Sequence, residues 1–464
     1  MSSILYILLS SLVRIFRKHF QRILYDSLGN ELVFLLPLLI SFYKISGCAN
    51  SNVVGRIPQN QFRGEQMEKA GKLISGALCW LIAAAAGVLG FYYAVLPGTL
   101  SAETFGTVTG NFCGARVTEL SGGGCRYTLC GMEIKPVDLK VKARKMLIPG
   151  GEPFGIKLRT DGVMVVSVNT GSPAEKCGIR AGDMITSVNG VEVGTNSEIG
   201  EAVQRSSECC TVIVRRGNGE KQIRLTPESV DGCLRLGAWV RDSAAGIGTM
   251  TFCDPDAGMF AGLGHPVSDV TTGELMPLSS GEATTAEIYS AIKGRNGETG
   301  ELCGELCEKV IGSIDQNTQV GVFGTLDGEM SGTPMPMAFR QEIKCGPAVI
   351  LATIQGMEPQ EYSIEIEKVN LCAMGGSKSM VIRVTDERLL DSAGGIVRGM
   401  SGSPIIQNGM IAGAVTHVFV NDPTRGYAVF AESMVDEMES GAAQAALFYR
   451  FREPLKTGLK RENG

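Results

Sequence analysis

A serine between two glycines stands in Gly394-Gly-Ile-Val-Arg-Gly-Met-Ser-Gly-Ser-Pro404, which leads directly into the apolar pair Ile405-Ile406. Gly399 and Gly402 carry no Cβ, so they leave room for a substrate carbonyl to approach Ser401. They also permit backbone angles that aim neighbouring N–H groups at one point, where a tetrahedral oxyanion can be stabilised. The same stretch also fits an ordinary Gly/Ser turn before a strand. A catalytic interpretation therefore requires a base for the serine.

The base must come from the three histidines of the chain, His19, His265 and His417. A serine hydroxyl needs a nearby imidazole to take its proton, and a carboxylate to hold that imidazole in the right tautomer. His265 lies in Gly-Leu-Gly-His-Pro, which predicts a fixed loop at a strand end, although loop histidines are also found as ordinary surface residues. His417 alternates with apolar residues and is interpreted as a packed or hydrogen-bonded strand residue. From the residues alone, His265 is thus the stronger candidate for the base, and its role stays open at this point.

The pattern of residues 230–445 favours a β-barrel architecture. Short β-rich runs punctuated by glycine recur there, among them Gly246–Phe252, Gln319–Thr325 and Ala348–Ile354. An α/β-hydrolase places its histidine after the serine and a helix directly after the nucleophile. Pro404 and the β-branched pair behind it instead predict a strand after the serine turn.

Three segments resemble the stage IV sporulation protein B peptidases, which are membrane-tethered serine peptidases of endospore-forming bacteria. They are the Gly-Leu-Gly-His-Pro segment at His265, the segment around Ser401, and Gly413-Ala-Val-Thr-His-Val-Phe-Val-Asn-Asp-Pro423. The resemblance covers roughly residues 70–439. The order of the motifs is also similar to that of chymotrypsin-like double β-barrels, so we expect that fold.

The resemblance implies a catalytic triad of His265, Asp386 and Ser401, with an oxyanion hole formed by the N–H groups of Gly399 and Ser401. Asp386 matches the family's aspartate upstream of the serine motif. From the residues alone the third member stays open, because a lone aspartate is usually a turn or cap residue. The alternatives are Asp242, Asp269 and Asp391 for the aspartate, and Ser403 for the nucleophile. We prefer Ser401 because Ser403 precedes a proline and has no glycine two residues before it.

The chain begins with an unusual segment and an apolar run. Leu73–Leu96 is almost continuously apolar and long enough to span a bilayer. Lys69 and Lys72 precede it and the next basic residue is Arg116, so we expect a cytoplasmic N-terminus and a translocated catalytic part. A cleaved signal peptide is the alternative, with small residues for cleavage at Ser101-Ala102. We interpret residues 1–66 as a non-native extension preceding a start at Met67, or as a disordered or membrane-associated one.

Residues 148–229 look like a PDZ domain of the bacterial protease type. A strand, a short capped helix, an Asn-Gly hairpin signal at Asn189-Gly190 and a second helix follow one another. Such domains add a peptide C-terminus or internal peptide to their sheet edge. By resemblance the carboxylate-binding loop is Pro153-Phe154-Gly155-Ile156. The alternative is a small α+β domain that binds no ligand.

Composition limits the partners and cofactors. The net charge of −5 gives no basic footprint for nucleic acid. Fourteen cysteines are present, but Cys303-Gly-Glu-Leu-Cys307 has no second pair at zinc-site spacing, so we assign no metal and no cofactor.

The expected fold is mainly β, with a transmembrane helix, an α+β PDZ domain and a double β-barrel peptidase. The expected parts are the extension at 1–66, the anchor at 67–97, a linker region with short strands at 98–147, the PDZ domain at 148–229, the peptidase at 230–445 and a polar tail at 446–464.

Two functions compete at this stage. The resemblance implies a serine endopeptidase that cleaves a membrane-associated regulator, and itself, during sporulation. In this role it would signal from forespore to mother cell from the space between their membranes, through regulators of a sigma factor processing complex. The alternative is a catalytically silent scaffold whose PDZ domain binds the C-termini of membrane partners.

Overall fold

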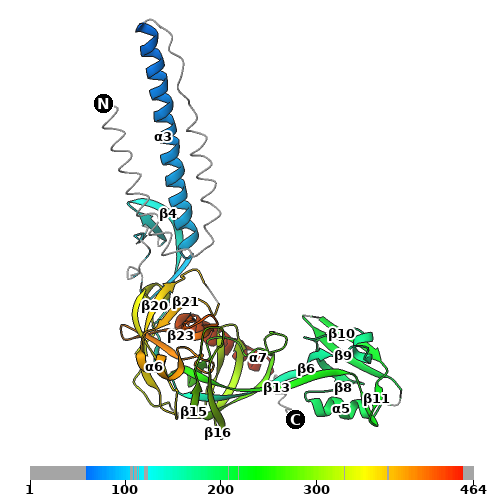
Figure 1. Ribbon diagram of the computed structural model, residues 1–464. Coiled ribbons are helices and arrows are strands. Elements are labelled where there is room, and N and C mark those ends of the chain that lie inside the picture. The colour runs from blue at the N-terminus through cyan, green and yellow to red at the C-terminus, as the bar shows by residue number, and fades with distance from the viewer. Residues whose placement is uncertain are drawn as a thin grey trace, which may run out of the picture. The chain divides into compact units, whose positions relative to one another are not determined.

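The computed structural model describes residues 59–452, except residues 105–107, 109–111, 113, 120–123, 207, 218, 329, 374 and 375 (Figure 1). Most of the predicted N-terminal extension, residues 1–58, lies outside the described residues, as does the end of the polar tail. The chain divides into two compact units, residues 1–91 and 92–464.

The first described element is helix α3 (Gln59–Val95). Its segment Ser75–Val95 is 21 residues long and apolar enough to cross a membrane. Trp80, Leu81 and Ile82 are each about 60% exposed, as expected of side chains that have no protein partner to pack against.

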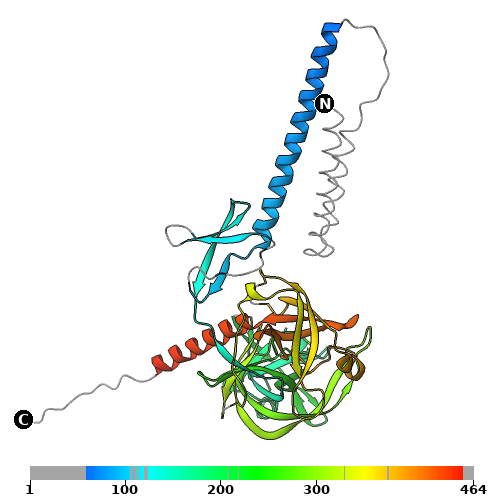
Figure 2. The same cartoon turned by 90° about the vertical axis from the view of Figure 1, so that its left-hand side faces the viewer.

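The predicted linker region contains a four-stranded sheet in the order β1-β4-β3-β2 (Figure 2). Its strands are β1 (Thr99–Ala102), β2 (Arg116–Glu119), β3 (Cys125–Leu129) and β4 (Met132–Val141). In β1, Leu100 is fully buried, and the Ser101 hydroxyl donates a hydrogen bond to the buried carboxylate of Glu432. Ser101-Ala102, the alternative cleavage site, is therefore buried in a strand of the folded protein.

The first barrel is closed by six strands in the ring β6-β15-β16-β17-β14-β13, because β13 also pairs with β6. Strands β5 and β18 extend the same sheet beyond β13. The bounds are β5 (Met146–Pro149), β6 (Pro153–Val168), β13 (Ala238–Asp254), β14 (Met259–Gly262), β15 (Leu278–Ile292), β16 (Glu301–Thr318), β17 (Gly321–Leu326) and β18 (Met335–Pro336).

The PDZ fold is inserted into this barrel, between β6 and β13. The inserted elements are α4 (Pro173–Lys176), β7 (Met184–Val188), β8 (Val191–Glu192), α5 (Asn196–Gln204), β9 (Cys210–Arg216), β10 (Gly219–Leu225), β11 (Glu228–Val230) and β12 (Cys233–Arg235). Helix α5 begins with a capping box in which Thr195 and Glu198 satisfy each other's backbone amides. Figure 1 shows β6 and β13 side by side where they enter the inserted fold.

In the structure, the PDZ fold therefore begins later in the chain than the predicted residue 148. β5 and the first half of β6, predicted as PDZ, pair with barrel strands, and only residues from about Val163 onward pair with the PDZ strand β7. The reason is that an apolar strand has the same local pattern in whichever sheet it pairs.

The second barrel closes in the order β19-β20-β21-β24-β23-β22. Its strands are β19 (Gly346–Ala352), β20 (Gln360–Val369), β21 (Met380–Val384), β22 (Pro404–Gln407), β23 (Met410–Phe419) and β24 (Asp422–Phe430). Helix α6 (Glu387–Ala393) follows β21, and α7 (Ala431–Arg452) follows β24. The predicted class, a mainly β chain with a PDZ fold and two barrels, is confirmed.

Candidate active site

Ser401 lies in the turn between α6 and β22, at the start of the second barrel's fourth strand in chain order. Its side chain is half-buried, and its Oγ donates a hydrogen bond to the carbonyl of Thr416, 2.7 Å away. Ser403, the rival nucleophile, is fully buried, and its Oγ has no hydrogen-bond partner among the described residues. Of the two serines, Ser401 is the one a substrate can reach.

His265 follows β14 of the first barrel and is half-buried. Its Nδ1 lies 2.8 Å from the carbonyl of Pro266. Because a carbonyl only accepts, Nδ1 is the donor and carries the proton, which leaves Nε2 with a lone pair. Burial of the ring lowers the pKa of His265 below its usual 6.5. The imidazole is therefore neutral at physiological pH, in the tautomer that a general base requires.

The His265 loop and the Ser401 turn meet beside β23. A Cβ added at Gly264 would lie 3.0 Å from Cγ2 of Thr416, the residue whose carbonyl accepts the Ser401 hydroxyl. A Cβ at Gly402 would lie 2.7 Å from the backbone nitrogen of Leu263 and 1.9 Å from the Thr249 carbonyl. Gly402 also has a φ of +100°, so glycine is required there by both space and conformation.

His417 lies directly against His265. Their ring centroids are 4.8 Å apart with the planes tilted by 39°. Loss of solvation, then the neighbouring His265 and Lys378, lower the pKa of His417 to about 4. The sequence predicted a packed or hydrogen-bonded strand residue; His417 does lie in β23 and its ring contacts His265, but the residue as a whole is exposed. His417 follows Thr416, whose carbonyl accepts the hydrogen bond from Ser401, so its position in the chain already places it near the serine.

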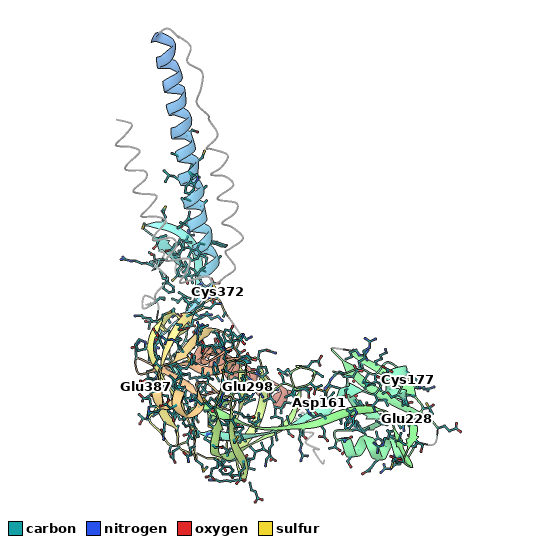
Figure 3. All side chains as sticks on the ribbon, viewed as in Figure 1. Asp161, Cys177, Glu228, Glu298, Cys372 and Glu387 are labelled. Atoms are coloured by element: carbon teal, nitrogen blue, oxygen red, sulfur yellow. The ribbon has the colours of Figure 1, made fainter. Side chains whose placement is uncertain are left out.

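The Asp386 carboxylate forms its hydrogen bonds with residues of its own loop and of β20. Asp386 is the N-cap of α6, and its carboxylate accepts hydrogen bonds from the backbone N–H groups of Arg388 and Ser363 and from the Arg388 guanidinium. These bonds, the Arg388 side chain first, lower the pKa of Asp386 to about 2. No hydrogen bond among the described residues joins Asp386 to His265. Figure 3 labels Glu387, the first residue of α6, next in the chain to this cap.

The alternative aspartates are also engaged elsewhere. Asp269 accepts hydrogen bonds from the amides of Thr271 and Thr272 and pairs with Arg241. Asp242 accepts from the amide of Asn196 in the PDZ fold. The backbone carbonyl of Asp391 accepts a hydrogen bond from the Lys293 ammonium at 3.0 Å. In the part of the chain that the structure describes, the hydrogen-bond partner of the His265 Nδ1 is a backbone carbonyl.

The backbone of residues 398–401 is fixed by hydrogen bonds to its carbonyls. The Leu302 amide donates to Arg398 O (2.8 Å), and the Ser403 amide donates to Met400 O (3.0 Å). In a trans peptide the N–H points opposite to the carbonyl. The N–H groups of Gly399 and Ser401 are therefore oriented away from these donors, and neither has an acceptor among the described residues.

The predicted carboxylate loop at Pro153–Ile156 is a strand in the structure. These four residues begin β6 and are buried, with Gly155 paired to Thr284 on one side and to Ile247 on the other. Both edges of the backbone are thus occupied by barrel strands, which leaves no free amides for a peptide carboxylate. The prediction of this loop is wrong for that reason.

A different loop has free amides next to an open sheet edge. The carbonyls of Leu236 and Gly237 accept hydrogen bonds from the amides of Ala174 and Asn169, each at 2.9 Å. By the same trans-peptide geometry, the N–H groups of Gly237 and Ala238 point away from these donors. Gly237 has a φ of +80°, which a turn of this kind requires.

The edge of β13 that follows this loop is open among the described strands. From Ala238 to Gly248, β13 pairs with β6 alone among the described strands. Val240 packs against the PDZ core cluster that contains Ile199 and Val203 of α5. The edge and α5 thus form the sides of a candidate peptide site that the sequence did not indicate, because the residues that build it are distant in the chain.

Comparison with known proteins identifies both parts. Residues 232–435 match the family model described as SpoIVB peptidase S55, and residues 164–216 match a PDZ domain model. Serine protease HTRA1 of Xenopus tropicalis is 32% identical over 72 residues, 16% of this chain and 16% of that protein. A probable periplasmic serine endoprotease DegP-like of Hahella chejuensis is 43% identical over 60 residues, 12% of this chain and 13% of that protein. The chain thus spans about a sixth or less of the length of these curated relatives.

Two solved structures are similar in part. The active form of a protease from M. tuberculosis aligns with 42% of this chain and 74% of its own, at 14% identity and a TM-score of 0.27. The PDZ domain of an SdrC-like protein from Listeria monocytogenes aligns with 17% of this chain and 87% of its own, at 24% identity and a TM-score of 0.16. The match confirms the resemblance seen in the sequence motifs: residues 232–435 are similar to the SpoIVB peptidase S55 family, and residues 164–216 are similar to PDZ domains.

Proposed function

We propose that the protein is a serine endopeptidase with Ser401 as nucleophile and His265 as general base. The observation that carries this proposal is the turn at 398–401. In it a half-buried serine stands beside two N–H groups that have no acceptor among the described residues, and the loop of a neutral histidine lies next to it. The match to the SpoIVB peptidase S55 family model supports the same reaction.

In the proposed reaction, the Ser401 hydroxyl turns from the Thr416 carbonyl to the Nε2 of His265. Its Oγ then attacks the scissile carbonyl while Nε2 takes the proton. The N–H groups of Gly399 and Ser401 would stabilise the oxyanion, a contribution of about 3–4 kcal/mol per donor. His265 then returns the proton to the leaving amine, and water repeats the sequence to release the second product.

In this proposal, the group that orients the His265 imidazole is not the aspartate of the expected triad. The Pro266 carbonyl accepts from Nδ1 of His265 and fixes the tautomer that a carboxylate would otherwise fix. We propose that Asp386 acts instead on the fold, as the cap of α6.

The PDZ domain would select or hold the substrate, or another peptide, at the edge of β13. By resemblance the substrate is a membrane-associated regulator cleaved during sporulation, with self-cleavage in addition and signalling to a sigma factor processing complex. Ser75–Val95 would anchor the protein, with the N-terminus in the cytoplasm and the catalytic part between the forespore and mother cell membranes.

The deciding experiment compares Ser401→Ala with Ser403→Ala in the full-length protein in detergent. A fluorophosphonate probe should label the wild type and Ser403→Ala and leave Ser401→Ala unlabelled, because only Ser401 is accessible and activated. Mass spectrometry of the labelled peptide identifies the site. Labelling of Ser401→Ala but not of Ser403→Ala would make Ser403 the nucleophile, and labelling of neither the wild type nor either variant would favour the scaffold function.

A further inference from the structure

Thr249 of β13 is bound to both loops that carry the candidate catalytic residues. Its amide donates to the carbonyl of Ser401 at 3.0 Å, and its hydroxyl donates to the carbonyl of Gly399 at 2.8 Å. Its own carbonyl accepts from the amide of Leu263, two residues before His265, at 3.3 Å. All three polar groups of one first-barrel residue are therefore used at the junction of the two barrels.

This contact is tightly constrained. Thr249 is 2% exposed, and the Thr249 carbonyl lies so close to the Ser401 turn that any side chain at Gly402 would overlap it. A buried carbonyl that loses its donor costs about 1–3 kcal/mol. The peptide between Gly399 and Met400 is held at both of its polar groups: the Thr249 hydroxyl donates to the Gly399 carbonyl at 2.8 Å, and the Met400 amide donates to the Val397 carbonyl at 3.2 Å.

That hydroxyl completes the set of donors that fix the turn. Leu302 and Ser403 hold the carbonyls of Arg398 and Met400, and Thr249 holds those of Gly399 and Ser401. Without the hydroxyl, the peptide between Gly399 and Met400 keeps only the longer bond from the Met400 amide to the Val397 carbonyl, so its carbonyl side can rotate more easily. Rotation there displaces the adjoining N–H groups of Gly399 and Ser401, which must stay within about 0.5 Å of their productive positions.

We propose that Thr249 is a positioning residue, which holds the Ser401 turn in its reactive form through the hydrogen bond from its hydroxyl to Gly399. This role rests on the proposed peptidase function and adds to it a residue outside both catalytic loops. Thr249 touches neither substrate nor the reacting atoms, so its effect is expected on the rate of the chemical step and not on binding.

The test measures fluorophosphonate labelling of the full-length protein in detergent, separating the maximal labelling rate, kinact, from the half-saturating probe concentration, KI. Thr249→Val keeps the shape and removes the hydroxyl. It should lower kinact roughly 10- to 100-fold and change KI by no more than about twofold. Thr251→Val is the matched control, because Thr251 lies on the same strand, is fully buried, and its hydroxyl has no partner among the described residues. It should label at the wild-type rate.

A second pair of variants controls for misfolding. Thr249→Ser and Thr249→Ala both lose the methyl group and differ only in the hydroxyl, so Ser should label faster than Ala by roughly tenfold or more if the hydrogen bond matters. Equal kinact values for Ser and Ala, or equal losses in Thr249→Val and Thr251→Val, would overturn the positioning role. Failure of the peptidase proposal looks different, because Ser401→Ala would then label like the wild type.

Discussion

At the scale of single residues, the sequence predicted the proposed base and nucleophile but did not indicate which group contacts Nδ1 of His265. His265 and Ser401 each lie in a short motif with glycine, which permits unusual backbone angles, and proline, which restricts them, so the turns can be predicted from local sequence. Which group faces Nδ1 of the imidazole depends on contacts across the fold. Asp386 has the expected place in the chain, yet its carboxylate is used by the helix that begins behind it.

Replacing Asp386 by Asn distinguishes a role as the N-cap of α6 from a role in orienting His265. Asn is an equally good N-cap, so the helix start is retained, and the lost pair with the largely exposed Arg388 should lower the free energy of unfolding by less than about 1 kcal/mol. We expect the fluorophosphonate labelling rate to stay within about threefold of wild type, whereas loss of a carboxylate that orients the base typically costs about 10⁴-fold.

The pH dependence of folding provides a check on the same variant. Because the pKa of Asp386 is lowered from 3.8 to about 2 in the folded protein, its contribution is complete above pH 3.8 and disappears as pH falls through 2. Urea unfolding should therefore show wild type and Asp386→Asn converging at low pH. A large loss of labelling with normal unfolding would return Asp386 to the triad.

His417 should set the pH at which the base becomes active. Its ring covers part of His265, and burial lowers the pKa of His265. His417→Ala exposes that ring to water, so the pKa of His265 should rise toward 6.5. Since the base works only when neutral, the acid limb of the labelling rate should move to higher pH.

The matched control is His417→Phe, which keeps a ring against His265 and should leave the acid limb near its wild-type position. The measurement is the fluorophosphonate labelling rate from pH 4 to 8, with the pH range taken from the His reference value of about 6.5. An acid limb that is the same in wild type, His417→Ala and His417→Phe would mean that His417 does not affect the base.

At the scale of elements, β13 is the strand that joins the two functional parts. It begins at the open edge beside α5, and further along the same strand Thr249 binds the Ser401 turn. The sequence located the strands of this region but not their pairing, because pairing partners are separated by the whole PDZ insertion. This is why the carboxylate loop was predicted at Pro153–Ile156, and why the candidate loop before β13 was not recognised from the sequence.

Peptide binding by two variants tests which loop holds a peptide carboxylate, the loop at Gly237 or the predicted one at Pro153–Ile156. A Cβ at Gly237 would lie 2.3 Å from that of Ser172 and would be strained at a φ of +80°, so Gly237→Ala should distort the loop and abolish binding. Phe154→Leu, at the loop predicted from the sequence, should leave binding unchanged. The probe is a pool of fluorescent decapeptides with apolar C-terminal residues, tested by polarisation with free and with amidated C-termini.

We expect the free-carboxylate peptides that bind to lose affinity when amidated, because the amides before β13 would then lack their anion. Weaker binding by Phe154→Leu together with normal binding by Gly237→Ala would place the site at β6 instead. Equal binding of free and amidated peptides would indicate recognition of an internal segment.

At the scale of the whole molecule, the barrels, the PDZ fold and the apolar helix were all predictable as types of structure. Their local signals are strong, since glycine-punctuated strands, capped helices and a long apolar run depend on nearby residues alone. The order in which the parts interrupt each other was not predictable, because it is decided by which strands close the first barrel.

The insertion of the PDZ fold between β6 and β13 has a consequence for a broken chain. A proteolytic nick in an exposed PDZ loop would divide the protein into two fragments, and each would keep one of the two long paired strands. The fragments would then be held together by the closed barrel, as in a split protein that reassembles from its halves. Electrophoresis under denaturing conditions would record such a molecule as cleaved while its two catalytic loops remained in one intact body.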